Sequence, residues 1–344
     1  MIRNLAALLV LALVALLGFP PPQDAHAGAG CAAYTYTLTN GTTADANQVM
    51  SNFNTIRNCA NTTAAGSGAN SDITSLTGLT TPLSTAQGGT GSAVGPVLRD
   101  YLAGMILSND SGTPNTVLDI SAGYATDSTN AVAINLGAFT KSTGGTWAAG
   151  SGSNGMGTGL TIANNTWYHV FAIINAGVAD AYFDTSVTAA NAPASTTAFR
   201  RIGSFKTATG TTNILAFTQD GDYVRWTANL LDVNATNPGT SAVSETLTVP
   251  PGVNVIAFGG IQLGGQAGAQ NYALLSDLVA TDTAATGSSS TVGGVGTAGG
   301  DFAGNWSTRT NTAQQIRVRI SASDAGTVVA LTTMGWVDTR GRYK

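Results

Sequence analysis

Side chains that can transfer protons or hold metals are scarce in this chain. Beyond the first 27 residues the sequence contains one histidine, one glutamate, three lysines and two cysteines. General acid–base and metal-assisted catalysis use such side chains in pairs or clusters. The scarcity therefore favours a protein that presents a binding surface, with no catalytic group and no cofactor.

Four aspartates could form carboxylate pairs. Asp220 and Asp222 flank Gly221 and could bind calcium, but the further oxygen ligands of a calcium loop are missing, so a tight turn is favoured. Asp180 and Asp184 fall on one face of a predicted strand, where we expect them to be solvated. An Asp-based polysaccharide-degrading enzyme, the alternative function, would draw its acid and its base or nucleophile from these four residues.

Two more residues are candidates for a site. His169 lies in an apolar run with Trp167 and Phe171, which predicts a histidine in the core or at a strand edge. No Gly-x-Ser-x-Gly motif occurs that would indicate a hydrolase. Trp306, which follows Gly304 and Asn305, is the tryptophan that we expect to be exposed, where it could stack on a sugar; the alternative is a core position.

The composition excludes several classes of protein. Charged residues make up 9% of the chain, against about 25% in ordinary domains. The net charge is −4, and the basic residues are scattered along the sequence, with Arg317 and Arg319 the nearest to a cluster. Nucleic-acid binding normally needs a concentrated cationic surface, so we expect no nucleic-acid partner. A hydrophobic content of 43% is enough for a core.

The N-terminus resembles a secretion signal. A short positive region precedes an apolar run of 15 residues, Leu5–Phe19, and Ala25-His26-Ala27 is a small-x-small cleavage site. Cleavage between Ala27 and Gly28 predicts an exported protein: periplasmic, cell-surface or secreted. An uncleaved anchor is the alternative, but a membrane span needs about 20 apolar residues.

Export permits a disulfide bond. The two mature cysteines, Cys31 and Cys59, allow one pairing, which would close a loop of about 28 residues and stabilise a small module by ~3–4 kcal/mol. The alternative is lipid attachment at Cys31, but the residues before it lack the usual leucine.

The order of elements predicts a mainly β protein. Alternating Tyr, Thr and Leu at 34–39 predict a short strand, and Val49, Phe53, Ile56 and Ala60 predict a helix whose N-cap is Thr43 or Asp45. From about residue 101, short strands alternate with Gly, Asn and Asp turns, as in a β-sandwich or jelly roll. The expected organisation is a signal peptide (1–27), a strand–helix module (28–62), a Thr/Ser/Gly-rich connector (63–98), a β-rich domain (99–232) and a C-terminal β-rich domain (233–344), the last two being alternatively one sandwich.

Several segments resemble tail-fibre and tail-associated proteins of phages and prophages of Gram-negative bacteria. They are Tyr36–Val49, Pro82–Gly91, an ordered series that comprises Gly104–Asn109, Asp119–Gly123, Asn165–Val170, Arg200–Ser204 and Gln219–Asp222, and a last match, Gly335–Arg342, near the C-terminus. The resemblance implies a β-rich homo-oligomer, commonly a trimer, that adheres to a cell-surface glycan or protein without catalytic residues. Phage fibres need no secretion signal, so the signal here suggests a prophage-derived module exported by its host.

Overall fold

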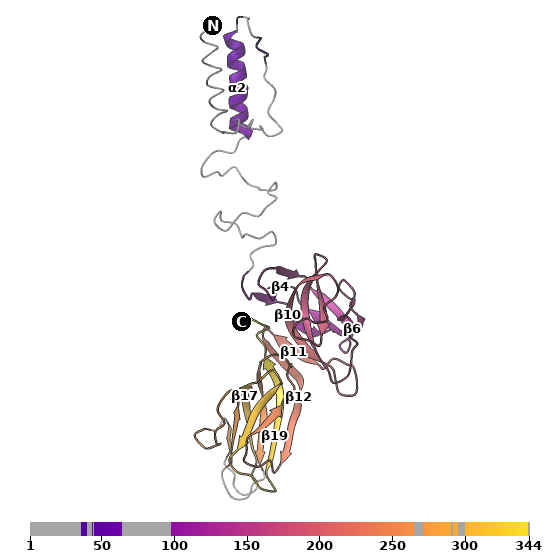
Figure 1. Ribbon diagram of the computed structural model, residues 1–344, viewed down its shortest axis with the longest axis vertical. Helices are drawn as coiled ribbons and strands as arrows, with labels where there is room; N and C mark the ends of the chain where they lie inside the picture. Colours follow the sequence, from indigo (N-terminus) through magenta and orange to yellow (C-terminus); the bar gives the residue numbers. More distant parts are fainter. Residues whose placement is uncertain are drawn as a thin grey trace, which may run out of the picture. The chain divides into compact units, whose positions relative to one another are not determined.

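The chain forms two compact units, Met1–Thr80 and Thr81–Lys344. The computed structural model describes residues 36–39, 43, 45–63, 98–264, 271–289, 292–294 and 300–342. Strands dominate the second unit, which confirms the predicted mainly β fold (Figure 1). Across the described ranges, no helix is both long and apolar enough to cross a membrane.

The first unit contains one described helix, α2 (Ala46–Thr63), close to where the sequence predicts it. Asp45 is the N-cap, because its side-chain Oδ1 accepts the Asn47 N–H at 2.8 Å and its backbone oxygen accepts the Val49 N–H at 3.1 Å. The predicted strand at 34–39 is wrong for its described part: Tyr36 bonds through its backbone N–H and C=O to the Asn52 amide, and residues 36–39 do not form a strand.

The second unit begins with an N-terminal lobe of two sheets. One sheet has the order β1-β4-β5, and the other has the order β10-β8-β9-β7-β6-β3-β2. Strand β8 is buried on both faces because apolar residues occupy nearly every position. The strands are β1 (Leu102–Gly104), β2 (Leu107–Asn109), β3 (Val117–Ile120), β4 (Gly123–Thr126), β5 (Ala133–Leu136), β6 (Phe139–Thr146), β7 (Asn154–Met156), β8 (Trp167–Asn175), β9 (Val178–Asp184) and β10 (Thr196–Lys206).

The C-terminal lobe also has two sheets, with the orders β11-β12-β19-β14-β17 and β13-β18-β15-β16. Alternate residues of each sheet enter one core, for example Leu263 and Leu331 from the first and Leu275 and Val318 from the second. The strands are β11 (Phe217–Asp220), β12 (Tyr223–Thr236), β13 (Val243–Thr246), β14 (Ile256–Gly264), β15 (Asn271–Ser276), β16 (Val292–Gly294), β17 (Phe302–Arg309), β18 (Gln315–Ile320) and β19 (Val328–Val337).

A cluster of three tryptophans joins the two lobes. The ring centroids of Trp167, Trp226 and Trp336 lie 5.0–5.8 Å apart, and the three residues belong to a single buried core. Strand β12 also runs through position 232, where the sequence suggests a domain boundary. The second unit therefore has a continuous core through both lobes.

The C-terminal sheet requires a glycine at one position. A Cβ atom on Gly259 would lie 1.8 Å from the backbone oxygen of Thr332. The pairing of β14 with β19 shifts register between Phe258 and Gly259, which brings the two backbones together at this point.

Candidate functional site

The expected solvation of Asp180 and Asp184 is wrong, because both side chains are buried. Asp180 Oδ1 lies 2.9 Å from the Nζ atom of Lys141, and its Oδ2 accepts the Gly150 N–H at 2.7 Å. The sequence gives no sign of this pair, since Lys141 lies on β6 and Asp180 on β9, and the strand between them, β7, pairs with both.

Asp184 is a structural acceptor. Its oxygens accept hydrogen bonds from the backbone N–H groups of Ser186 and Asn191, from the Asn191 amide and from the Tyr182 hydroxyl, at 2.8–3.2 Å. Burial, followed by the charge of Asp184, raises the pKa of Tyr182, so this phenol remains a donor. Four donors account for the buried carboxylate of Asp184.

Asp220 and Asp222 flank the turn between β11 and β12, in which Gly221 has a φ of +58°. Asp222 forms ion pairs with Arg340 and Arg342. Among the described residues, no group of three or more His, Cys, Asp or Glu side chains could hold a metal ion. The turn thus positions the Asp222 carboxylate to pair with two arginines, and not to bind a metal ion.

His169 is buried, as the apolar run around it predicts, and it belongs to a polar network that the sequence does not predict. Its Nδ1 lies 2.8 Å from Ser204 Oγ and accepts the Arg201 Nε–H at 3.2 Å. Arg201 is bidentate to Asp338, at 2.6 and 3.2 Å. Burial, followed by the charge of Arg201, lowers the pKa of His169 to about 3. The histidine is therefore neutral at physiological pH.

The network has the residue types of a catalytic triad without its connections. Asp338 binds Arg201, whereas a catalytic carboxylate would bind the histidine. His169 and Ser204 are only 1% and 4% exposed. Burial raises the pKa of Asp338, but the charge of Arg201 and its hydrogen bonds outweigh burial and hold this pKa below its usual value. The arrangement joins β8 and β10 to the segment after β19.

The prediction that Trp306 is exposed is wrong. Its side chain is 5% exposed and its Nε1–H donates to the backbone oxygen of Gly260 at 2.9 Å. Trp306 lies on β17, a strand that the sequence does not predict; the alternation of this strand turns Asn305 outward and Trp306 into the core. Sugar stacking on Trp306 is therefore not proposed.

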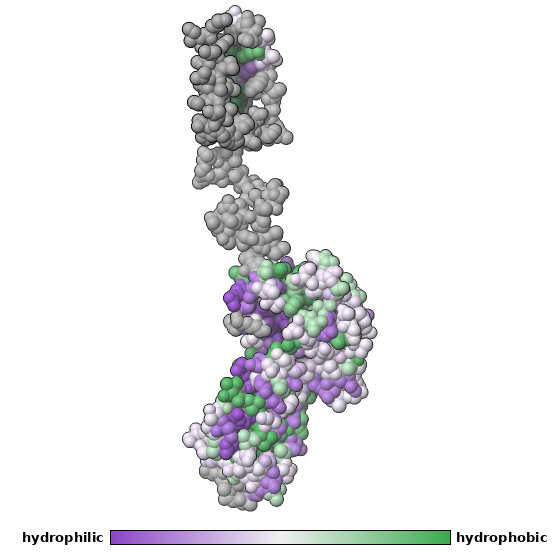
Figure 2. All heavy atoms as spheres, in the orientation of Figure 1, coloured by the Kyte–Doolittle hydropathy of each residue, from purple (hydrophilic) through white to green (hydrophobic). Residues whose placement is uncertain are grey.

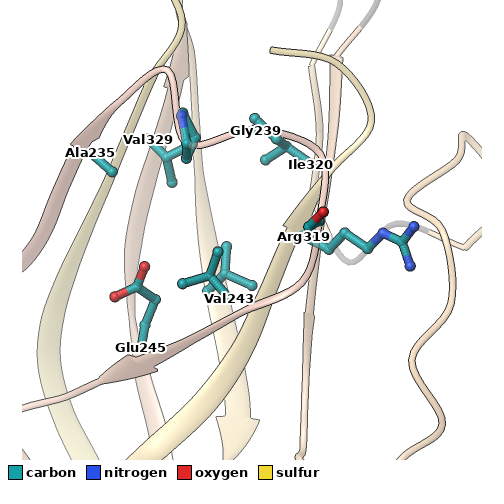
Figure 3. Close-up of a pocket in the computed structure, with 10 residues that line it drawn as sticks. Ala235, Gly239, Val243, Glu245, Arg319, Ile320 and Val329 are labelled. Carbon is teal, nitrogen blue, oxygen red and sulfur yellow. The ribbon is translucent and has the colours of Figure 1, made fainter.

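The one glutamate of the chain lines a very small pocket. Glu245, Val243 and Val329 border a space of about 10 Å³ between the two C-terminal sheets, which is room for one water molecule (Figure 3). Burial raises the pKa of Glu245. The space is too small to admit a substrate.

A groove of about 590 Å³ crosses the outer face of the β12-β19-β14-β17 sheet. The strand register explains its shape. Asn234, Ala330, Gln262 and Ala303 form one row across the four strands, and the next row is Leu231, Thr332, Gly260 and Asn305. Small residues form the floor, and amides and a leucine form the walls.

The polar side chains that line this groove are all neutral. Asn234, Gln262 and Asn305 are exposed, and the Leu231 side chain is 58% exposed beside them. Hydrophobic and hydrophilic side chains are both exposed over the lobe that contains β17 and β19 (Figure 2). Amide groups both donate and accept hydrogen bonds, so the groove suits a ligand rich in hydroxyls.

A second cleft, of about 670 Å³, lies between residues of the two lobes. Six arginines and two aspartates line it, so nearly half of the chain's fourteen basic residues gather here. These residues are scattered along the sequence, but the fold brings six of them together, which the sequence does not lead us to expect. The arginines are Arg99, Arg200, Arg201, Arg309, Arg340 and Arg342.

Some predicted sites lie outside the described residues. These are the signal cleavage site at Ala27 and Gly28, Cys31, and the side chain of Cys59. Comparison with known protein families gave no matching family model, and comparison with curated proteins gave no matching sequence.

Proposed function

We propose that this chain is an exported, non-enzymatic adhesion protein, related to phage and prophage tail fibres, that binds a cell-surface glycan. The observation that carries the proposal is the groove on the outer sheet, in which Asn234, Gln262 and Asn305 surround a floor of alanine and glycine. Such a surface offers hydrogen bonds in several directions, and none of the residues that line it is charged.

The interactions of the aspartate carboxylates also favour adhesion over hydrolysis of a polysaccharide. Asp180 and Asp184 are buried and bound to protein donors, and Asp222 is bound to arginines. Hydrolysis of a polysaccharide would require an acid and a base or nucleophile on either side of a bound sugar. None of these three aspartates lines the outer-sheet groove.

Glycan-array screening of the chain from Gly28 to Lys344 tests the proposal. We expect binding to a defined set of glycans, weakened about tenfold or more by N234A combined with N305A, because each lost hydrogen bond costs on the order of 1 kcal/mol. The matched control is N135A, which removes an exposed amide on β5 outside the groove.

Two results would contradict the proposal. One is the absence of binding to glycans and to intact cells, and the other is release of sugar from capsule by the purified chain. The mass of the chain in solution tests the accompanying proposal that it is a homo-oligomer such as a trimer.

A further inference from the structure

One arginine of the arginine-lined cleft, Arg200, has no hydrogen-bond partner among the residues that the structure describes. Arg200 is 4% exposed, and its Nε and Nη2 atoms have no hydrogen-bond partner within the described part of the chain. A buried cation without hydrogen bonds is costly, and native proteins rarely leave one unsatisfied. The unsatisfied guanidinium of Arg200 therefore suggests that a ligand supplies its hydrogen-bond acceptor.

The other buried arginines of this cleft are already bound. Arg201 is bidentate to Asp338. Arg340 donates to the backbone oxygens of Gly104 and Met105 at 3.0 and 3.2 Å. These residues fix the wall of the cleft.

The remaining three arginines have weaker or more exposed partners. Arg342 pairs with Asp222. Arg309 and Arg99 lie 3.5 Å from the carboxylates of Asp277 and Asp100, with side chains that are 52% and 79% exposed. Arg200 is thus the lining arginine for which the described structure shows no acceptor.

The nearby carboxylates are committed to other groups. Asp127 accepts four hydrogen bonds, from the N–H groups of Ala131 and Val132 and from the N–H and hydroxyl of Thr129. Asp100 Oδ1 accepts the Asn130 amide at 3.2 Å. Burial, opposed in part by Asp100, lowers the pKa of Arg200, and the neighbouring arginines lower it further.

The two unpartnered nitrogens define the ligand's chemistry. The N–H bonds of Nε and Nη2 lie on the same edge of a guanidinium and point in parallel, which matches the two oxygens of a carboxylate or a phosphate. Ser128, Asn254 and Thr312 also line the cleft and offer neutral hydrogen-bonding groups of the kind that sugar hydroxyls use.

We infer that this cleft is a binding site for an oxyanion, with Arg200 as its bidentate anchor, and that its ligand is an acidic saccharide. The same guanidinium edge could hold a free phosphate group. This cleft and the outer-sheet groove share no lining residue. A negative result for one site therefore leaves the proposal for the other unaffected.

Calorimetric titration of the full exported chain tests the inference with three probes: trigalacturonic acid, its fully methyl-esterified form, and inorganic phosphate. We expect trigalacturonic acid to bind and the ester to bind about tenfold more weakly or worse, since the ester has lost its charge. R200M removes the guanidinium while keeping a long apolar stem, and should weaken binding by about tenfold or more.

A matched variant and a second measurement separate binding from folding. R225M removes an exposed arginine of β12 outside the cleft and should keep its affinity within about twofold of the parent. The melting temperature of ligand-free R200M should equal or exceed that of the parent, because the substitution removes an unpaired buried charge. N234A combined with N305A should bind trigalacturonic acid as the parent does.

Each outcome decides the question. Arg200-dependent binding of trigalacturonic acid supports the site and its ligand class. Arg200-dependent binding of phosphate alone supports the oxyanion site and overturns the saccharide. Binding of neither probe, equal binding by R200M, or a lower melting temperature for ligand-free R200M overturns the site.

Discussion

The Nζ atom of Lys141 lies 2.9 Å from Oδ1 of Asp180, and the two side chains are 0% and 4% exposed. Lys141 also donates to the backbone oxygens of Ala148 and Gly150 at 2.6 and 3.0 Å, and the rings of Phe139 and Trp147 lie beside it. Each proton of this buried ammonium therefore has an acceptor, in a chain with very few charges to place.

K141M should destabilise the protein by about 3–5 kcal/mol, because it leaves the Asp180 carboxylate buried without its cation. Urea denaturation at pH 7 measures the loss. The matched control is R309M, which removes an exposed partner of Asp277 and should cost less than about 1 kcal/mol. If K141M and R309M lowered the unfolding free energy by similar amounts, the buried pair would contribute no more to stability than the exposed one.

The neutral state of His169 makes stability depend on pH. The unfolded histidine takes up a proton below about pH 6.5, whereas the folded one does so only near its pKa of about 3. The unfolding free energy should therefore fall as pH decreases from 6.5 towards 3, by up to about 1.4 kcal/mol per pH unit. H169Q should lack this part of the slope in denaturation curves taken at pH 7, 5.5 and 4; an unchanged slope would exclude His169 as its source.

Asp338 should affect stability in a more acidic range. Its pKa is lowered on folding, so its stabilising contribution is present above the unfolded value of 3.8 and is lost as pH falls through the folded value. At pH 7, D338N should cost about 3–5 kcal/mol by leaving Arg201 without its carboxylate. D282N, at a partly exposed pair with Arg319, is the control and should cost less than about 1 kcal/mol. If D338N costs no more than D282N, the buried network does not hold the lobes together.

G259A should disrupt the pairing of β14 with β19. The new Cβ would lie 1.8 Å from the Thr332 backbone oxygen, so we expect a loss of several kcal/mol in unfolding free energy or failure to fold. G137A is the control, since a Cβ there has nothing within 4 Å and the residue's φ is not positive. Thermal unfolding followed by circular dichroism measures both variants, and equal melting temperatures would contradict the close approach.

Local patterns predicted the elements whose residues alternate clearly. The Val117–Ile120 run is β3, and the Asp45 cap and the spacing of Val49, Phe53 and Ile56 locate α2. The strands that the sequence does not predict, such as β7 and β16, are short and rich in glycine and asparagine, so they have little apolar alternation to detect. Their pairing depends on neighbours that are distant in sequence.

The site residues were harder to predict because each depends on long-range pairing. Asp180 follows the alternation of a strand with one solvated face, but Lys141 on β6 covers it. The six arginines of the cleft come from segments that extend from residue 99 to residue 342. Adjacent Arg200 and Arg201 were a visible signal, but the sequence does not show that Arg201 meets Asp338 while Arg200 meets no acceptor.

The segment after β19 returns to the beginning of the second unit. Arg342 Nη1 donates to the backbone oxygen of Leu102 at 3.4 Å, and Arg340 reaches Gly104 and Met105. Residues near 102 and 342 are therefore spatial neighbours, so a short linker could join them and new termini could be opened at Gly177, in the exposed turn between β8 and β9. The unit is in this sense suited to circular permutation, and it could be inserted into the loop of a host protein with entry and exit points side by side.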